Sequence, residues 1–168
     1  IPYIKSIIKG FNIPILEVDG FEADDLIGTI AKQAEAEGVD VYMVTPDKDM
    51  CQLVSEHIFV YKPPYMGRPY EILDYKTVCE KWEVDDPIQV IDILGLMGDA
   101  SDNIPGCPGV GEKTAVKLLK EFGSIENLLQ NTNKLTGALK TKVEENREKI
   151  EFSRFLATIK IDVPVDLD

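Results

Sequence analysis

The stretch EADDLIGTIAKQAEAEGVDVYMVTPDKDMCQLV, residues 22–54, contains the pattern that decides the fold. Residues 22–38 predict an amphipathic helix, because apolar side chains recur at helical spacing and Gly38 is placed to end the helix. Residues 39–45 are rich in β-forming side chains and predict a strand, and residues 47–54 predict a second, short helix. The chain therefore alternates helix and strand over this stretch.

The same alternation continues on both sides of it. Residues 2–11 predict a helix that ends near Gly10, and the apolar run 12–19 predicts a strand. Residues 57–63 predict a further strand, and residues 63–73 a turn or hairpin. Strands and helices that alternate with short links are typical of a mostly parallel sheet flanked by helices, so the predicted fold class is α/β.

The second half of the chain is predicted to be helical. Residues 74–82 and 86–98 have the helical pattern, and Pro87 stands near the first turn of the second segment. From Ile104 onward, glycine and proline punctuate the chain before further helices. These helical segments are 112–123, 124–131 and 137–159.

Charge is distributed unevenly along the sequence. The whole chain of 168 residues has a formal net charge of −12, which by itself argues against a nucleic-acid partner. Residues 1–103 carry −12, residues 104–160 carry +3, and residues 161–168 carry −3. The molecule is thus an acidic body joined to a mildly basic segment, and this asymmetry is more informative than the total.

Other residue types narrow the classes of function. The three cysteines are odd in number and widely spaced, so we expect neither a disulfide framework nor a zinc site, and a reducing cytoplasm is the expected location. The single histidine, His57, precedes a predicted strand, and histidine-based catalysis is not expected. No run of about 18 apolar residues occurs, so no membrane partner is expected. The chain opens on Ile1 without a signal segment, and we expect it to be part of something longer.

Seven acidic residues fall in three short groups at the ends of predicted elements. Asp47 and Asp49 directly follow the strand at 39–45, and loops after parallel strands converge at one edge of a sheet, where ligands bind. Glu22 and Asp25 are three positions apart and therefore share one face of a helix. The seven candidates are Glu22, Asp24, Asp25, Asp47, Asp49, Asp99 and Asp102.

Carboxylates that converge repel one another unless something positive lies between them, and Lys48 is the nearest basic candidate. Mg²⁺ or Mn²⁺ would solve the problem, because hard cations prefer carboxylate oxygens. Two such ions about 3.5–4 Å apart would activate a water and stabilise the leaving oxygen in phosphodiester hydrolysis. Each acidic group alone also fits a capped helix end or a polar loop, so the metal prediction rests on the three together.

A glycine-rich hairpin precedes the helix that begins at Glu112. Residues 108–111, PGVG, predict a tight turn whose glycines let another backbone approach closely, and the N–H groups at the helix start suit a phosphate. Such contacts position a nucleic-acid backbone without reading its sequence. A plain glycine-rich connection between helices is the alternative. The candidate DNA-binding residues are Gly109, Val110, Gly111, Lys113, Thr114 and Lys117.

These motifs together resemble the 5′-nuclease domain of bacterial family A DNA polymerases, which belongs with the flap endonucleases. The ordered motifs are EADD at 22–25, DKD at 47–49 and GDASDNIPGCPGVG at 98–111, and the similarity covers about residues 1–160. The resemblance implies a PIN-like α/β nuclease core over residues 1–100. It also implies a helical subdomain over residues 101–168, of the helix–three-turn–helix (helix–hairpin–helix-like, SAM-like) type, whose C-terminal segment packs back on the core.

The resemblance also implies chemistry and partners. The seven acids would form a divalent metal site for Mg²⁺ or Mn²⁺, with Asp24, Asp47, Asp49, Asp99 and Asp102 catalytic. The glycine hairpin would hold duplex DNA, with a potassium ion bound through backbone carbonyls. The implied reaction removes 5′ flaps and RNA primers in replication and repair, at 5′-flap or nicked duplexes and RNA–DNA junctions. A polymerase domain is expected in the same full-length chain, and no oligomer is required.

The family pattern begins with a strand that carries another metal-binding Asp, a further Asp and a helical arch, all of which would lie upstream of Ile1. We therefore expect the 168 residues alone to have weak or no nuclease activity. One alternative is a non-catalytic DNA-binding module with a vestigial cation site. Another is a haloacid-type phosphatase that uses Asp47 and Asp49, which would leave the hairpin and the other five acids unexplained.

Overall fold

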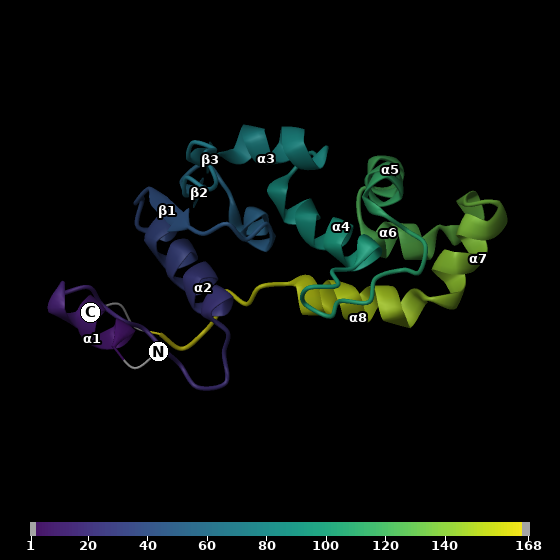
Figure 1. The fold of residues 1–168 in the computed structure, drawn as a ribbon. Helices are drawn as coiled ribbons and strands as arrows, with labels where there is room; N and C mark the ends of the chain where they lie inside the picture. The colour runs from purple at the N-terminus through teal and green to yellow at the C-terminus, as the bar shows by residue number, and fades with distance from the viewer. Residues whose placement is uncertain (1–2, 166–168) are drawn as a thin grey trace.

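The computed structural model describes residues 3–165, which form a small sheet with helices around it and a second, helical half (Figure 1). The elements of the first half are α1 (Ile4–Gly10), α2 (Ala23–Ala36), β1 (Val41–Val44), the 3₁₀ helix η1 (Asp49–Leu53), β2 (Ile58–Lys62), β3 (Glu71–Leu73), α3 (Tyr75–Trp82), the 3₁₀ helix η2 (Pro87–Gln89) and α4 (Val90–Met97). Those of the second half are α5 (Glu112–Phe122), α6 (Ile125–Gln130), the 3₁₀ helix η3 (Thr132–Lys134), α7 (Gly137–Glu145) and α8 (Arg147–Ala157). Within residues 3–165, no helix combines the length and the apolar character that crossing a membrane requires.

The sheet has the strand order β1-β2-β3 within the described residues. Strands β1 and β2 are parallel, with Val41 opposite Ile58, and β2 and β3 are antiparallel, with Val60 opposite Leu73. The α/β class and the hairpin after β2 are confirmed, but the sheet is mixed rather than mostly parallel. The link 63–70 is too short for a parallel return, because such a crossover needs about a dozen residues or more.

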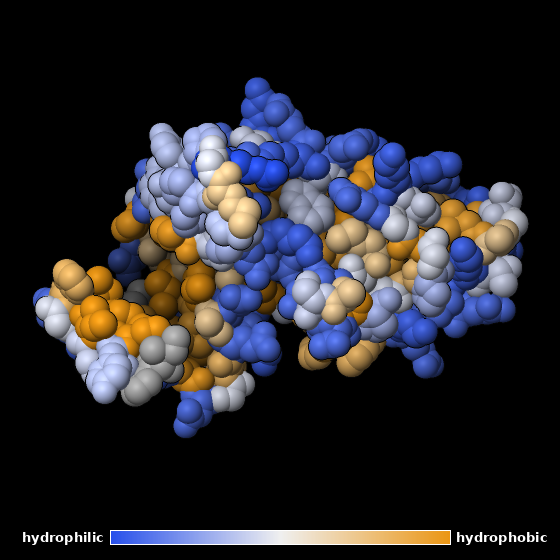
Figure 2. All heavy atoms as spheres, viewed as in Figure 1, coloured by the Kyte–Doolittle hydropathy of each residue, from blue (hydrophilic) through white to orange (hydrophobic). Residues whose placement is uncertain are grey.

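The strand predicted over residues 12–19 is wrong. These residues lie between α1 and α2 in irregular structure, and Ile13 and Leu16 are 55% and 41% exposed. A strand needs a neighbour that satisfies its backbone groups, and no strand of residues 3–165 pairs with this segment. Figure 2 shows apolar side chains gathered over the α1 end of the molecule, where α1 itself buries none of its residues.

The helix predicted over residues 137–159 forms two helices, α7 and α8, with a break at Asn146. The amide of Asn146 donates a 2.8 Å hydrogen bond to the carbonyl oxygen of Lys142. Asparagine side chains compete with the backbone for such partners, which explains why the helical pattern is interrupted at this position. The other predicted helices are confirmed, although residues 49–53 form a 3₁₀ rather than an α-helix.

Two clusters of buried apolar side chains share helix α4. Val90 and Leu94 pack in the α/β cluster, whereas Ile93 and Leu96 pack in the helical cluster, and all four are 0% exposed. Every residue of α4 from Val90 to Leu96 is buried, so this mostly apolar helix is enclosed by both clusters. The boundary placed at residue 100 stays a prediction, since α4, directly before it, contributes to both clusters.

Helix α8 crosses α4 at close range. A Cβ atom added at Gly95 would lie 3.0 Å from the Cα of Arg154, so the glycine allows the two backbones to approach. Beside the crossing, the buried carboxylate of Asp92 accepts a 2.6 Å hydrogen bond from Nε of Arg154, which also pairs with Glu126 at 3.1 Å. A buried carboxylate needs such a partner, so the pair fixes the orientation of α8 against α4.

The segment after α8 returns to the α/β half (Figure 1). The side chain of Gln52 donates to the carbonyl of Ala157 and accepts from the backbone N–H of Ile159, both at 2.9 Å. The N–H of Val163 donates to Oγ1 of Thr29 at 3.1 Å. These bonds attach the chain beyond α8 to η1 and to α2.

The loop between α4 and α5 is folded back on itself by two glycines. Residues Asp99 and Ile104 form an isolated antiparallel bridge, with N–H to oxygen distances of 2.9 and 2.8 Å. Gly98 and Gly106 flank it with φ of +73° and +61°, and a Cβ at Gly106 would lie 2.4 Å from the nitrogen of Gly98. Glycine is required here both for the left-handed backbone and for the close approach.

We predict that Gly106→Ala lowers the free energy of unfolding by roughly 2–4 kcal/mol, since it adds an overpacking cost to that of a left-handed backbone. The matched control is Gly67→Ala in the hairpin, where φ is +79° and nothing lies within 4 Å of an added Cβ. This control should cost only roughly 1–2 kcal/mol. Urea unfolding followed by circular dichroism measures both. Equal losses would contradict the role given to the contact with Gly98.

Candidate metal centre and nucleic-acid surface

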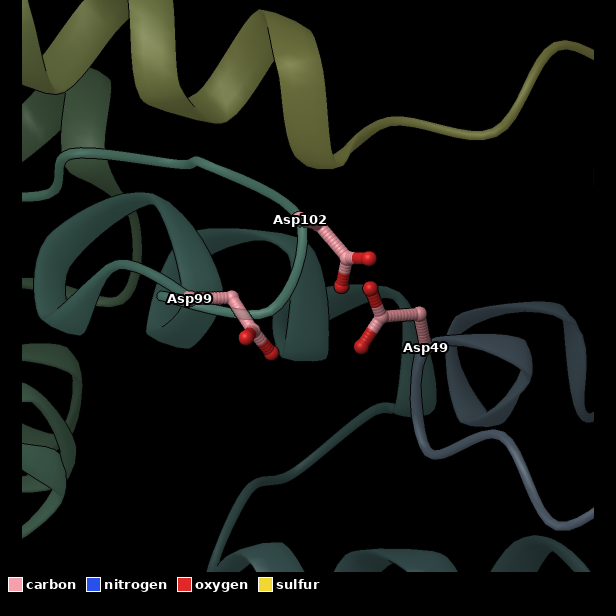
Figure 3. A group of neighbouring side chains, drawn as sticks. All are labelled: Asp49, Asp99 and Asp102. Atoms are coloured by element: carbon pink, nitrogen blue, oxygen red, sulfur yellow. The ribbon is translucent and has the colours of Figure 1, made fainter.

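Three predicted acids are brought together where the loop after α4 meets η1. One carboxylate oxygen from each of Asp49, Asp99 and Asp102 lies within 4.8 Å of the other two. Figure 3 shows Asp49 and Asp102 pointing toward each other, with Asp99 on the same loop as Asp102. The glycine-flanked bridge folds this loop, and Asp102 of the loop faces Asp49 of η1, from which it is 53 positions apart in sequence.

The other predicted acids lie beside this group in one cleft of roughly 560 Å³. The cleft is lined by six of the seven candidates, and only Asp99 is outside its lining; the six are Glu22, Asp24, Asp25, Asp47, Asp49 and Asp102. The N-terminus of α2, the residues after β1 and the loop after α4 supply them. The predicted convergence of three sequence-distant acidic groups therefore occurs in the fold, whereas their catalytic and metal-binding roles stay predictions.

Some of these carboxylates already accept hydrogen bonds from backbone N–H groups of the protein. Oδ2 of Asp25 accepts from the N–H of Glu22 at 3.2 Å and Oδ1 accepts from the N–H of Lys160 at 2.9 Å. The Asp25 side chain therefore caps the start of helix α2 and also binds the segment after α8. Asp47 similarly accepts from the N–H of Asp49 at 2.9 Å through Oδ1.

Lys48 supplies a positive charge within the acidic group. Its ammonium pairs with Oδ2 of Asp99 and lies 4.0 Å from Oδ1 of Asp49. The hydrogen bond from Lys48, together with that from Ser101, holds the pKa of Asp99 down at about 2. Burial alone would lower the pKa of Lys48, but its hydrogen bond to Asp99 and the charges of the nearby acids raise it.

Asp49 is the least satisfied member of the group. Its Oδ1 is buried and accepts no hydrogen bond from residues 3–165, and its side chain is only 14% exposed. Burial, and then the charge of Asp47, raise the pKa of Asp49 to about 6. Burial and four neighbouring carboxylates, with Asp47 first among them, also raise the pKa of Asp24. Lys48 therefore does not neutralise the cleft.

The residues present fit a hard divalent cation. A buried carboxylate oxygen with no partner costs free energy, and the donors that converge here are all oxygens, which Mg²⁺ and Mn²⁺ prefer. A cation placed among Asp49, Asp99 and Asp102 would satisfy that oxygen and reduce the repulsion.

The predicted DNA-binding hairpin leads directly into α5. Gly109 has φ +75°, and Gly111 is the residue before the first turn, with its carbonyl accepting from the N–H groups of Thr114 and Ala115 at 3.0 Å. Both glycines are exposed, which leaves the first N–H groups of the helix open to a ligand. Val110 differs from its neighbours, because it is 3% exposed and packs in the helical cluster. Only its backbone can face a ligand.

The predicted lysines are on the outer face of α5. Lys113 and Lys117 are exposed and Thr114 is half-buried, while Ala115 and Leu118 face the core. The exposed positions are therefore placed where a phosphate backbone could reach them. Their role as a DNA contact stays a prediction.

One part of the cleft lining, the wall formed by residues 155–160, was not predicted from the sequence. Residues 155–160, at the end of α8 and directly after it, line the cleft together with the acids. Phe155, Leu156 and Lys160 belong to this wall. No local signal marks them, because they reach the cleft through the crossing of α8 over α4.

We predict that Asp49→Asn raises the free energy of unfolding at pH 7 without metal by about 1–3 kcal/mol. The folded-state pKa of Asp49 is raised from 3.8 to about 6, so the folded protein binds the extra proton and its stability falls as pH rises through this window. The gain should therefore vanish near pH 4, where the carboxyl is protonated in the folded state. Urea unfolding at both pH values in EDTA measures it.

The exposed Asp19→Asn is the matched control for charge removal and should change the free energy of unfolding little at either pH. If Asp49→Asn destabilises the protein at pH 7, or stabilises it equally at pH 4 and pH 7, the repulsive burial assigned to Asp49 is wrong.

Comparison with known proteins finds relatives of high identity. DNA polymerase I of Bacillus caldotenax is 42% identical over 167 residues, which cover 99% of this chain and 19% of that protein. DNA polymerase I of Chloroflexus aurantiacus is 45% identical over 167 residues, covering 98% of this chain and 18% of that protein. The chain thus spans about a fifth of the length of the curated relatives it matches.

Solved structures share the fold. A mutant of T5 5′-exonuclease superimposes with a TM-score of 0.81 at 23% identity, covering 93% of this chain and 63% of that one. The catalytic core of Rad2 in complex with DNA substrate gives a TM-score of 0.62 at 17% identity, covering 96% of this chain and 56% of that one. These likenesses concern the arrangement of the chain in space.

Two family models divide the sequence between them. The N-terminal resolvase-like domain of 5′-3′ exonuclease matches residues 1–83, and the C-terminal SAM fold of 5′-3′ exonuclease matches residues 85–168. The second match begins before η2 and α4 and includes the helical half. Because the two matches together cover nearly every residue, the chain belongs to the 5′-3′ exonuclease family.

Proposed function

We propose that this chain is the nuclease part of a DNA polymerase I and that it hydrolyses phosphodiesters at 5′ ends and 5′ flaps with the help of divalent metal. The observation that carries the proposal is the acidic cleft, with its unpartnered Asp49 oxygen, in a chain of the 5′-3′ exonuclease family. The proposed substrates are 5′-flap and nicked duplexes and RNA–DNA primer junctions. We also propose a polymerase domain in the same protein, which is supported by the names of the relatives, of whose length this chain spans about a fifth.

The metal ligands that we propose are Asp49, Asp99 and Asp102, with Asp24, Asp47 and Glu22 lining the adjoining cleft. When bound, Mg²⁺ or Mn²⁺, as one ion or a pair, would lower the pKa of a water and stabilise charge on the leaving oxygen. T5 5′-exonuclease has been crystallised with divalent metal ions, zinc among them, which supports a cation in the corresponding fold.

The chain's own residues have distinct tasks in this proposal. Burial and neighbouring carboxylates raise the pKa values of Asp24 and Asp49, and a bound cation would relieve this repulsion and favour the ionised form of both. Both oxygens of Asp25 accept backbone hydrogen bonds, from Glu22 and Lys160, so Asp25 has no free oxygen for a metal. It instead positions the start of α2 relative to the segment after α8. Lys48 lies beside Asp99 as a resident counter-ion, and its long side chain can turn toward a substrate phosphate once a cation replaces it.

The duplex beyond the cleavage point would rest on the hairpin and on α5. Gly109 and Gly111 allow a phosphate to approach the first N–H groups of the helix, and Lys113 and Lys117 add positive charge. Relatives of the same fold have been solved with DNA, namely T5 D15 flap endonuclease and Rad2. A potassium ion at the hairpin and a cytoplasmic location remain predictions from the sequence.

We predict that Asp102→Asn lowers the rate of 5′-flap cleavage in Mg²⁺ by about 100-fold or more, since a proposed metal ligand is lost. Asp102 is exposed and accepts no hydrogen bond from the other described residues, so Asp102→Asn should leave the fold intact. The measurement is single-turnover cleavage of a labelled flap by the protein that carries this chain, with Asp19→Asn as control.

Duplex binding measured in EDTA should be unchanged by Asp102→Asn. Cleavage at the wild-type rate would contradict the metal assignment. Failure of the wild-type protein to cleave while it still binds the flap would favour a non-catalytic DNA-binding module. Asp102→Asn that abolishes cleavage of flaps but leaves hydrolysis of a phosphate monoester would exclude the phosphatase alternative as the source of the flap activity.

We also predict that Lys113→Ala and Lys117→Ala each weaken binding to duplexes of every sequence alike. Contacts to phosphates release counter-ions, so each substitution should reduce the slope of log affinity against log salt by about 1. The matched control is Lys76→Ala, an exposed lysine on α3 that pairs with Glu80. Fluorescence anisotropy across a salt series gives the slopes. A loss confined to particular sequences would contradict a backbone contact.

A further inference from the structure

Helix α8 presents two large aromatic rings to solvent. Phe152 is 55% exposed and Phe155 is 69% exposed, and the adjacent Leu156 is 42% exposed. The opposite side of the helix packs in the protein interior, because Ile150 is buried in the helical cluster and Ala157 in the α/β cluster. The rings are therefore not needed to hold α8 in place.

The exposed rings run toward the acidic cleft. Phe155 and Leu156 line that cleft together with Asp24, Asp49 and Asp102. Phe152 precedes Phe155 by three residues, so the two rings are neighbours on one face of the helix, roughly 5–6 Å apart at their Cβ atoms. The face is thus continuous with the cleft rather than an isolated patch.

The same wall carries positive charge. Lys160, which also lines the cleft, lies 5.4 Å from the centroid of the Phe21 ring. An occupant of this wall must therefore combine flat apolar faces with negative charge, while its reacting bond lies among the carboxylates. Unpaired nucleotides meet this description, because each base offers a π face and each linkage a phosphate.

We propose that Phe155, with Phe152 behind it, forms a stacking platform for unpaired nucleotides of the strand that enters the acidic cleft. The inference rests on the proposed nuclease function, and it adds the surface that receives the single-stranded part of the substrate. A phenyl ring cannot read base edges by hydrogen bonding, so the platform accepts any sequence. Phe155 is a positioning residue, which sets how an unpaired strand passes the carboxylates.

The test uses binding, so it does not depend on cleavage. Two probes are compared in Ca²⁺ with the protein that carries this chain: a blunt duplex, and the same duplex with a 5′ single-stranded extension that contains 2-aminopurine next to the junction. Phe155→Ala should weaken binding of the extended probe about tenfold and abolish quenching of 2-aminopurine. Blunt-duplex binding should not change. Phe155→Trp should restore both signals, and Phe152→Ala should give a smaller loss.

The matched control is Tyr65→Ala, because Tyr65 in the β2–β3 turn is also 69% exposed and lies outside the cleft. It should leave both probes unaffected. The proposal is overturned if Phe155→Ala binds and quenches the extended probe as the wild type does, or if it weakens both probes equally. Unchanged binding with a lower melting temperature would likewise overturn it and would identify the face as a protein contact.

Failure of this proposal and failure of the nuclease proposal give different results. A protein that does not cleave flaps but shows the Phe155-dependent quenching has the platform without the nuclease. A protein that cleaves flaps, with Phe155→Ala binding and cleaving as the wild type does, has the nuclease without the platform.

Discussion

Helix α4 is buried from Val90 to Leu96, with Asp92 as its one charged side chain, and water must therefore be excluded from every side of it. The α/β cluster covers one side, the helical cluster covers another, and α8 crosses it at Gly95. The positions of the functional residues follow from this enclosure. The end of α4 fixes where the glycine-flanked loop begins, and that loop carries Asp99 and Asp102. The crossing also fixes where the chain leaves α8 and becomes a wall of the cleft.

Enclosure brings together charges that would otherwise stay apart. Asp49 has a buried oxygen without a partner, and Lys48 compensates mainly Asp99. Local stability is therefore lower than the same fold would have with neutral side chains at these positions, as expected where a site is arranged for a ligand. The buried carboxylate of Asp92, on α4, differs from Asp49 because Arg154 lies beside it.

Much of the fold could be predicted from periodicity and from turn residues, because both act locally. Helix α2, with its acidic first turn and Gly38 at its end, follows from residues 22–38 alone. The strand predicted at 12–19 failed because an apolar run does not reveal whether a partner strand is beside it. The direction of β3 is set by the length of the link before it, which the pattern of apolar residues does not express.

Some residues of the candidate site could likewise be predicted from the sequence, and others could not. The acids could be proposed because each group stands at the end of an element, where loops of an α/β fold converge. Phe155 and Lys160 could not, since an exposed aromatic or a lysine on a helix looks the same in sequence whether it faces open solvent or a cleft. Only the packing of α8 over α4 gives them a place.

The number of acidic residues in the cleft gives its negative charge but not the number of oxygens that are free to bind an ion. The hydrogen bonds within the cleft distinguish the two. Asp25 contributes charge, but both of its oxygens already accept hydrogen bonds from the backbone. The oxygens of Asp99 are paired with Ser101 and Lys48, so Asp99 can bind an ion only where the ion replaces the Lys48 ammonium. Asp24, Asp49 and Asp102 contribute charge together with oxygens that have no protein donor among the hydrogen bonds of the described residues. The coordination capacity of the cleft is therefore smaller than its negative charge. More carboxylates attract an ion than can bind it directly.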